Sequence, residues 1–402
     1  MSGKTRELTF DLREEIDMRK QFVVFVAIVS VGYSWPCRAD LESGLVALQK
    51  EEYKTAFKEF IPAAKGGNSI AQFGLGYLFQ NGYGVVENYA EAFAWYSKAA
   101  NQGNADAMQK MATFYAYGLG TKQDVIVAVE WLRKAAQAGK AYATLENIPD
   151  VPKGSAEKKR FDDKVANAQE YFRRKAEQGD INAQVNLGCM YLAALGTSNE
   201  KLSANWSQAE GWFLKAAEKG NPTAQGLLGF MNAFELAGER DQVKAAKWYQ
   251  LAANQGNASA QFMLAKIYSG TSSFKYPATK TVPKNIRNAK EWALKSAEQG
   301  FLPAKILLGS MLLSEESSER EHTEALMWLQ NGAKQADTGA QILIGDMYAI
   351  GRGVPKDYLQ AITWYRRAID SSKSKVAYGR LGQMYEEGLG VPKDSVQALM
   401  FY

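Results

Sequence analysis

The stretch that decides the fold is residues 92–120, which read AFAWYSKAANQGNADAMQKMATFYAYGLG. They predict a helix, a turn at Gly103, a second helix and an exit with two glycines. The same order recurs in register from about residue 50 to the last residue. With Trp95 as reference, the equivalent positions hold Trp131, Tyr171, Trp212, Trp248, Trp292, Trp328, Trp364 and Phe401. Repeats of this length indicate a stacked array of small units.

The same landmarks surround each reference aromatic. An alanine lies three residues before it, on the same helix face: Ala92, Ala128, Ala168, Ala209, Ala245, Ala289, Ala325, Ala361 and Ala398. The N-cap of the first helix is predicted seven residues before it, at Asn88, Asp124, Asn205, Asp241, Asn285, Asp357 and Asp394. A glycine able to turn left-handed lies eight residues after it: Gly103, Gly139, Gly179, Gly220, Gly256 and Gly300. The cap of the second helix then falls at Asn68, Asn104, Asp180, Asn221, Asn257 and Asp337.

Each second helix carries a small residue in its interior. The row consists of Gly76, Ala112, Gly188, Gly229, Ala265, Gly309, Gly345 and Gly382. A glycine inside a helix costs about 1 kcal/mol relative to alanine. Its recurrence therefore predicts that a neighbouring helix approaches closely at this point. We also expect the reference rings and their alanine companions to be buried between successive helix pairs.

The pattern resembles the Sel-1-like repeat family, a relative of the tetratricopeptide repeats. The match is closest in Ala92–Gly103, Ala107–Gly120, Ala361–Tyr365 and Leu381–Asp394, and the resemblance covers about 350 residues. It implies an all-α fold, an α/α superhelix in which antiparallel helix pairs form a right-handed solenoid. It also implies a scaffold for protein–protein interactions of the kind that bacteria often export, without naming the partner.

The N-terminal region has the pattern of a secretory signal. Residues 1–17 form a polar extension, and Met18 is an alternative start to Met1. Residues 18–39 then have a basic beginning, an apolar run from Phe22 to about Tyr33 and a small-residue end at Ala39. We predict cleavage near Ala39 and a periplasmic or secreted protein. The alternative is an uncleaved N-terminal membrane anchor, which is the one way in which the chain would meet a membrane.

The mature chain is predicted to be one solenoid. Residues 40–67 form a capping unit, with helices expected over 40–50 and 53–65, and residues 68–402 form the repeats. The rhythm is interrupted by insertions near 140–165, 195–205 and 270–286. In the first of these we expect a short helix after Lys140, a loop, and a long charged helix from Ser155 to about Glu177. Insertions in solenoids map to loops, either on a binding side or as surface padding.

The composition offers little for chemistry. The net charge of +5 is spread widely, which argues against nucleic acid as a partner. His322 is the one histidine among 402 residues, and this count excludes a His-rich metal site. We predict that His322 is a solvated residue near a helix start. Cys189 is predicted to be a small buried side chain. Ser-x-x-Lys occurs three times without the Lys-Thr-Gly or Ser-Asp-Asn partners of a β-lactamase. No catalytic residue, metal ligand or cofactor site is predicted.

The function predicted is therefore a non-enzymatic scaffold or adaptor in the bacterial envelope. It would bind a protein partner along the groove of the solenoid. Tyr96, Tyr249 and Tyr365 directly follow a reference Trp and are the candidate partner-binding residues; in the alternative, they complete the core between repeats. The alternative function is a β-lactamase-like envelope hydrolase, which the resemblance attributes to cysteine-rich relatives. This chain lacks their cysteine pairs.

Overall fold

The computed structural model describes residues 38–140, 156–192, 202–234, 241–270, 280–314, 316–335, 337–372 and 374–402. Within these ranges the regular elements are all helices. The first helices of the pairs are α3 (Tyr53–Lys65), α5 (Tyr89–Asn101), α7 (Val125–Gln137), α8 (Ala156–Glu177), α10 (Leu202–Glu218), α12 (Gln242–Asn254), α14 (Ile286–Glu298), α16 (Glu319–Ala333), α18 (Tyr358–Ser372) and α20 (Ser395–Phe401). The second helices are α2 (Arg38–Gln49), α4 (Ser69–Asn81), α6 (Ala105–Tyr117), α9 (Ile181–Leu192), α11 (Pro222–Ala233), α13 (Ala258–Ser269), α15 (Leu302–Leu312), α17 (Thr338–Ile350) and α19 (Lys375–Glu387).

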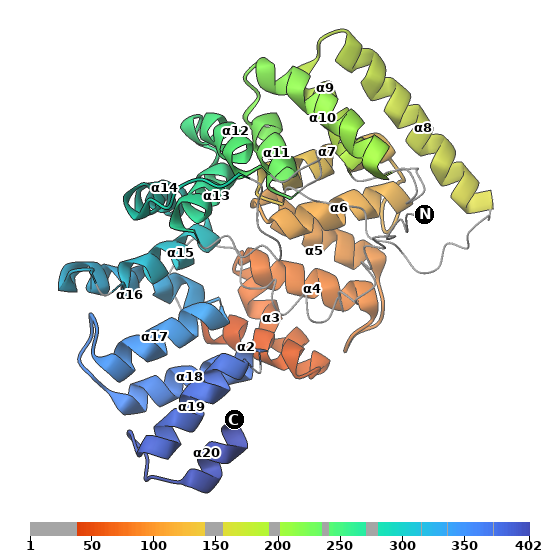
Figure 1. Ribbon diagram of the computed structural model, residues 1–402. Helices are drawn as coiled ribbons and strands as arrows, with labels where there is room; N and C mark the ends of the chain where they lie inside the picture. Colours follow the sequence, from red (N-terminus) through yellow and green to blue (C-terminus); the bar gives the residue numbers. More distant parts are fainter. Residues whose placement is uncertain are drawn as a thin grey trace, which may run out of the picture.

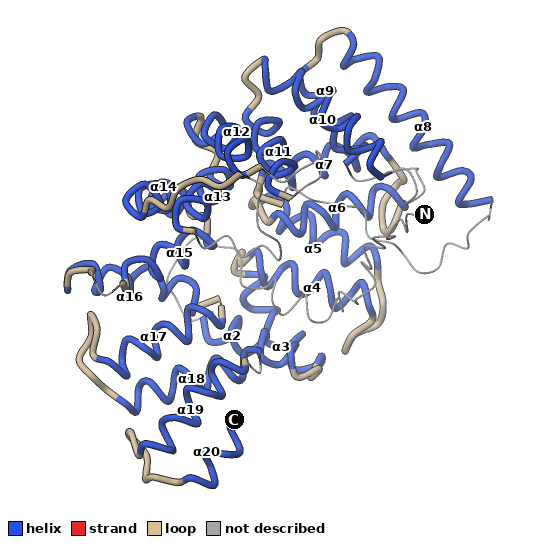
Figure 2. Tube along the Cα trace, in the orientation of Figure 1, coloured by secondary structure: helices blue, strands red, loops and turns tan. Residues whose placement is uncertain are grey.

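The helix pairs stack in chain order and form a curved array, as Figure 1 shows. Each helix packs mainly on its neighbours in sequence, and the array curves until α18 contacts α2. The tube in Figure 2 shows the short loops that join the helices. The predicted all-α solenoid of antiparallel helix pairs is thereby confirmed. No helix in the described ranges is both long enough and apolar enough to cross a bilayer.

The predicted caps are nearly all present. Asn88 Oδ1 accepts the backbone N–H groups of Ala90 and Glu91, and Asn104 does the same at the start of α6. The turn glycines have φ between 85° and 106° at Gly103, Gly139, Gly179, Gly220, Gly256 and Gly300, the left-handed conformation that favours glycine. Asn205 is the exception, because α10 already begins at Leu202. Asn205 is buried inside that helix, so its predicted role as N-cap is wrong.

The close approach predicted at the glycine row is confirmed. The group that approaches each glycine is a side chain from the first helix of the next repeat. A Cβ atom added at Gly76 would lie 2.6 Å from the ring of Tyr96. The side chain involved is the residue directly after the reference aromatic. The same arrangement pairs Gly188 with Phe213, Gly229 with Tyr249, Gly309 with Leu329, Gly345 with Tyr365 and Gly382 with Tyr402. Where the second helix carries Ala112 or Ala265 instead, the equivalent buried residue is the smaller Leu132 or Ala293.

The expectation that the reference rings are buried is only partly correct. Their alanine companions are at most 2% exposed, but the reference aromatics themselves are half-buried. A cation on the next turn covers several rings: Lys98 Nζ lies 4.0 Å from the centre of Trp95, and Lys215 Nζ lies 4.0 Å from that of Trp212. Residues three apart on a helix are surface neighbours, and a lysine stem covers apolar surface while its charge stays in water. The reference aromatics therefore form an outer row, and a cationic side chain covers several of the rings.

The capping unit consists of α2 and α3, close to the helices predicted for residues 40–50 and 53–65. Phe60 of α3 is fully buried and seats on Gly44 of α2 and Gly74 of α4. Helix α2 therefore acts as the second helix of a preceding unit. The polar extension (1–17) and nearly all of the predicted signal (18–39) lie outside the described residues, although Arg38 and Ala39 begin α2.

The insertions are described in part. The long charged helix predicted from Ser155 is α8, which ends at Glu177 as expected. The short helix predicted after Lys140 falls in residues 141–155, outside the described ranges. The same holds for most of the other two insertions, at 193–201 and 271–279.

Candidate functional site: the central pocket

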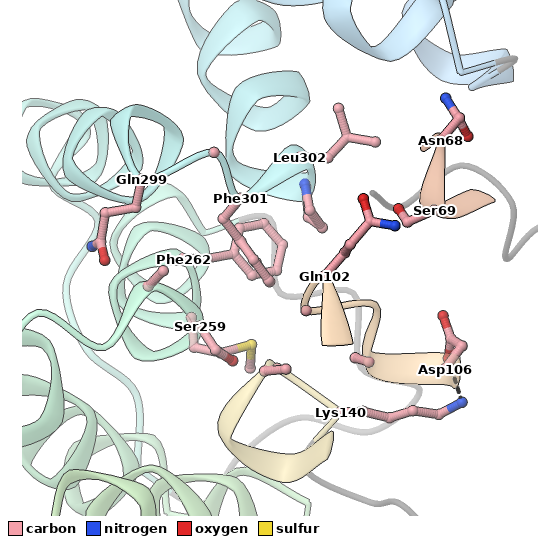
Figure 3. Close-up of a pocket in the computed structure, with 18 of the residues that line it drawn as sticks. Asn68, Ser69, Gln102, Asp106, Lys140, Ser259, Phe262, Gln299, Phe301 and Leu302 are labelled. Atoms are coloured by element: carbon pink, nitrogen blue, oxygen red, sulfur yellow. Dashed lines mark hydrogen bonds and ion pairs between the residues drawn. The ribbon is translucent and has the colours of Figure 1, made fainter. Parts of the chain in front are cut away.

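A pocket of about 650 Å³ lies where turns from distant parts of the array face one another. One wall comes from the turns α3–α4 and α5–α6 and from the end of α7. The opposite wall comes from the start of α13 and from the turn between α14 and α15 (Figure 3). The pocket thus joins residues 67–140 to residues 258–303, and the curvature of the array creates it.

The wall contributed by α13 and α15 is largely apolar. The rings of Phe262 and Phe301 meet edge to face, with their centres 5.5 Å apart. Met263, Leu302 and Pro303 extend the same wall. Phe262 and Phe301 are only half-buried, so part of each ring faces the open space of the pocket.

The wall contributed by the N-terminal turns is polar. Figure 3 shows Asn68, Ser69 and Gln102 on this side. Lys140 Nζ lies 2.6 Å from Asp106 Oδ1, and the two charges form an ion pair at the edge of the pocket. A carboxamide, a hydroxyl and a neutralised ion pair offer hydrogen bonds without a net charge.

Two departures from the repeat pattern coincide at this pocket. The position that holds Asn or Asp in most copies is Lys140 in one copy and Phe301 in another. Phe301 is the residue before α15, and no side chain caps that helix. Losing such a cap costs about 1 kcal/mol. Departures from a local sequence pattern that lie together in the structure are typical of functional sites.

Phe301 also bridges the two walls. A Cβ atom added at Gly139 would lie 2.9 Å from its ring and 3.6 Å from Ser259 Cβ, so the ring packs directly on the turn after α7. We did not predict this pocket from the sequence. The available signal was the absence of a capping residue after Gly139 and Gly300, two of the six turn glycines.

The three tyrosines predicted as partner-binding candidates lie in the core. Tyr96, Tyr249 and Tyr365 are 0%, 3% and 1% exposed, because the ring of each packs against a glycine of the preceding repeat. Tyr96 donates to Gln80 Oε1 at 2.8 Å, and Tyr365 donates to Asp346 Oδ1 at 2.7 Å. Burial, with the nearby Asp346 carboxylate, raises the pKa of Tyr365. Their location corresponds to the second of the two alternatives, completion of the core between repeats.

His322 is buried, so the prediction of a solvated side chain is wrong. It lies in the first turns of α16 beneath the exit turn at Gly353, where an added Cβ would lie 2.5 Å from the His322 backbone. Its Nε2 lies 3.3 Å from the carbonyl oxygen of Ser314. Cys189 is buried as predicted, and burial raises the pKa of its thiol to about 12. Neither residue lines the central pocket.

The described ranges contain no group of three His, Cys, Asp or Glu side chains placed to hold a metal ion. Of the three Ser-x-x-Lys matches, Ser155 and the segment 272–275 lie outside the described residues. Ser372, in the third match, accepts a hydrogen bond from Thr338 Oγ1 at 2.9 Å.

Comparison with known proteins places the repeats in a family. The family model described as Sel1 repeat matches residues 69–104, 105–140, 181–221, 222–257, 258–301, 303–337, 338–372 and 376–402. No match was found among curated proteins.

Solved structures of similar proteins include c5321 from uropathogenic Escherichia coli, described as a protective antigen with an SLR fold. It is 30% identical over 91% of this chain and 83% of its own, with a TM-score of 0.43. A Sel1 repeat protein from Oxalobacter formigenes is 25% identical over 93% of this chain and 90% of its own, with a TM-score of 0.42.

Proposed function

Because this chain belongs to the Sel1 repeat family, whose members typically act as scaffolds for protein–protein interactions, we propose that it is a non-enzymatic scaffold that binds a partner protein in its central pocket. The partner would contribute an extended segment rather than a flat surface. The observation that carries this proposal is the coincidence, at one pocket, of two walls of opposite character and two departures from the repeat pattern.

The lining suits a peptide. An aromatic or long aliphatic side chain would pack on Phe262 and Phe301, where part of each ring is uncovered. A peptide N–H group would donate to Gln102 Oε1 on the polar wall, because Gln102 Nε2 already donates to Gln72. The volume of about 650 Å³ lies within the range of pockets that enclose small ligands, which in proteins is roughly 300–1,000 Å³. It would hold a few residues of a longer segment.

We further propose that the chain is exported and acts in the periplasm or outside the cell. The support is the basic, apolar and small-residue order of residues 18–39. Cleavage after Ala39 would remove the first two residues of α2 and leave Leu41 and Leu45 in place in the core.

The pocket proposal predicts that binding depends on the apolar wall. Purified protein with the photo-crosslinking residue p-benzoylphenylalanine at Met263 should form one saturable crosslink with an envelope protein. Phe262→Ala should weaken that complex at least tenfold, as expected when an aromatic contact at the centre of an interface is lost. Leu251→Ala, on the exposed face of α12, is the matched control and should have no effect. Equal crosslinking with p-benzoylphenylalanine at Leu251 would contradict the proposal, as would turnover of a chromogenic β-lactam that persists through purification.

The export proposal predicts the N-terminus of the mature protein. N-terminal sequencing of the chain from the periplasm or the medium should begin at Asp40. A chain recovered from the membrane fraction with residues 18–39 intact would instead support the anchored alternative. Recovery of the intact chain from the cytoplasm would contradict both.

A further inference from the structure

A row of glutamines connects the two helices within five of the pairs. The glutamine lies four residues after the cap of the second helix, and its Nε2 donates to a carbonyl near the end of the first helix. Gln72 donates to Ala64 at 3.0 Å and Gln261 to Ala253 at 3.0 Å. Gln184, Gln225 and Gln341 donate in the same way to Ala176, Ala217 and Ala333. The Oε1 atom of each glutamine is then left to accept a hydrogen bond.

In three places a glutamine of the next repeat donates to that oxygen. The donor lies seven residues after the reference aromatic, near the end of the next first helix. The three bonds are Gln102 to Gln72 at 2.6 Å, Gln255 to Gln225 at 2.8 Å and Gln299 to Gln261 at 2.7 Å. We call each of these pairs a rung. Between α6 and α7 both positions are apolar, Met108 and Ala138, so the rung is absent as a whole.

Between α9 and α10 half of the rung is missing. Gln184 is 3% exposed, and its Oε1 atom has no hydrogen-bond partner among the described residues. The residue at the donor position is Lys219, whose Nζ donates instead to the carbonyl oxygen of Gly179 at 3.1 Å. A cavity of about 460 Å³ opens here, lined by Gln184, Lys219 and the ring of Trp212 among others. Gln341 Oε1 also has no donor in the described part of the chain, but Gln341 is fully buried and Ser371, at the donor position, is buried as well, so a ligand has no route to it.

We propose that this cavity binds the primary carboxamide of a partner's Gln or Asn side chain, which completes the vacant rung. The carboxamide N–H would donate to Gln184 Oε1, and the aliphatic stem would lie on the part of the Trp212 ring that Lys215 leaves uncovered. The lysine would swing aside, since Lys219 is exposed and held by a single hydrogen bond to a carbonyl. The three complete rungs are internal examples of the same contact. The site is separate from the central pocket and does not depend on the function proposed for it.

The surroundings favour a neutral amide over charged groups. A carboxylate has no N–H to offer to Gln184 Oε1, and the rim offers it no net attraction, because Glu177 and Glu218 balance Lys215 and Lys219. An ammonium group could donate, but the balanced rim gives it no net attraction to offset the loss of its hydration. An unpaired buried acceptor destabilises the protein, and a suitable donor recovers that free energy.

The first test compares two probes on the full chain by NMR. N-acetyl-glutamine N-methylamide should shift the indole N–H signal of Trp212, assigned with Trp212→Phe. N-acetyl-glutamate N-methylamide has the same backbone amides but a carboxylate, and it should bind at least about tenfold more weakly. Equal responses to the two probes, or none to the glutamine probe at saturating concentration, would overturn the proposal.

The second test fills the rung from within. Lys219→Gln should raise the melting temperature and abolish the response to the glutamine probe, because the new side chain takes the acceptor. Lys247→Gln, an exposed residue of α12, makes the same charge change away from the cavity and should alter neither. A Lys219→Gln variant that binds the probe as tightly as the parent would also overturn the proposal. If that variant did not fold, the comparison of the two probes on the unmodified chain would still decide.

Discussion

Gly229→Ala is expected to destabilise the protein by about 1–3 kcal/mol, although alanine is the better helix former. A Cβ atom at Gly229 would lie 2.7 Å from the ring of Tyr249, which is 3% exposed and cannot move into solvent. The matched control is Gly226→Ala in the same helix, α11. A Cβ atom there meets nothing within 4 Å, so this change should stabilise by up to about 1 kcal/mol. Chemical denaturation of the two variants should give shifts of opposite sign.

The same contact predicts a rescue. Where the glycine position holds Ala112, the ring position of the next repeat holds Leu132. Tyr249→Leu should therefore recover part of the stability lost in Gly229→Ala. The hydroxyl of Tyr249 is buried without a partner among the residues that the structure describes, so its removal breaks no hydrogen bond there. If the double variant lost as much stability as the two single variants together, the Tyr249 ring would not be what excludes a larger residue at position 229.

Phe60→Ala is expected to have the largest effect, a loss of about 3–5 kcal/mol. The ring is fully buried and contacts helices on both sides, because Gly44 and Gly74 both approach it. In a repeat array each unit contacts mainly its neighbours, so the damage should begin locally. Hydrogen exchange should accelerate first in α2, α3 and α4, before α11 or α13 respond.

The control for this experiment is Phe57→Ala on the same helix. Phe57 is half-buried and meets Phe79 edge to face, with ring centres 5.5 Å apart. Truncating it should cost clearly less than truncating Phe60. Uniform acceleration of exchange along the whole chain in Phe60→Ala would contradict local damage.

Local features of the fold could be predicted from the sequence because they repeat. Caps such as Asn104 and left-handed glycines such as Gly103 depend on a few neighbouring residues, and nearly all were placed correctly. Asn205 was misplaced because α10 continues upstream of the repeat boundary. That extension lies beside an insertion, where the periodic pattern gives no information.

The burial of the aromatics was harder to predict. Trp95 and Tyr96 are adjacent, and successive residues on a helix point about 100° apart. The spacing of Trp95 from Ala92 puts both on one face, but it does not say which neighbouring ring meets the next repeat. That depends on how the helix pairs cross. The structure puts Tyr96 in the contact with Gly76 and leaves Trp95 half-buried beside Lys98.

The central pocket could not be predicted, because it depends on the curvature of the whole array. Its walls are separated by more than a hundred residues, and no local pattern connects Gln102 with Phe301. The row of acceptor glutamines, in contrast, was visible in the sequence: Gln72, Gln184, Gln225, Gln261 and Gln341 occupy one repeat position. The groups to which these glutamines are hydrogen-bonded could be identified only from the structure.

The contact between α2 and α18 changes how the array can come apart. An open row of repeats frays from its outermost unit inward, so each end sets its own local stability. Here the contact closes the helices from α2 to α18 into a ring, in which α2 and α18 cover each other. Strain applied at one end can reach the other directly, without passing through every unit between them. Among the described helices, only α19 and α20 lie beyond this contact, so they form the one end that can fray independently.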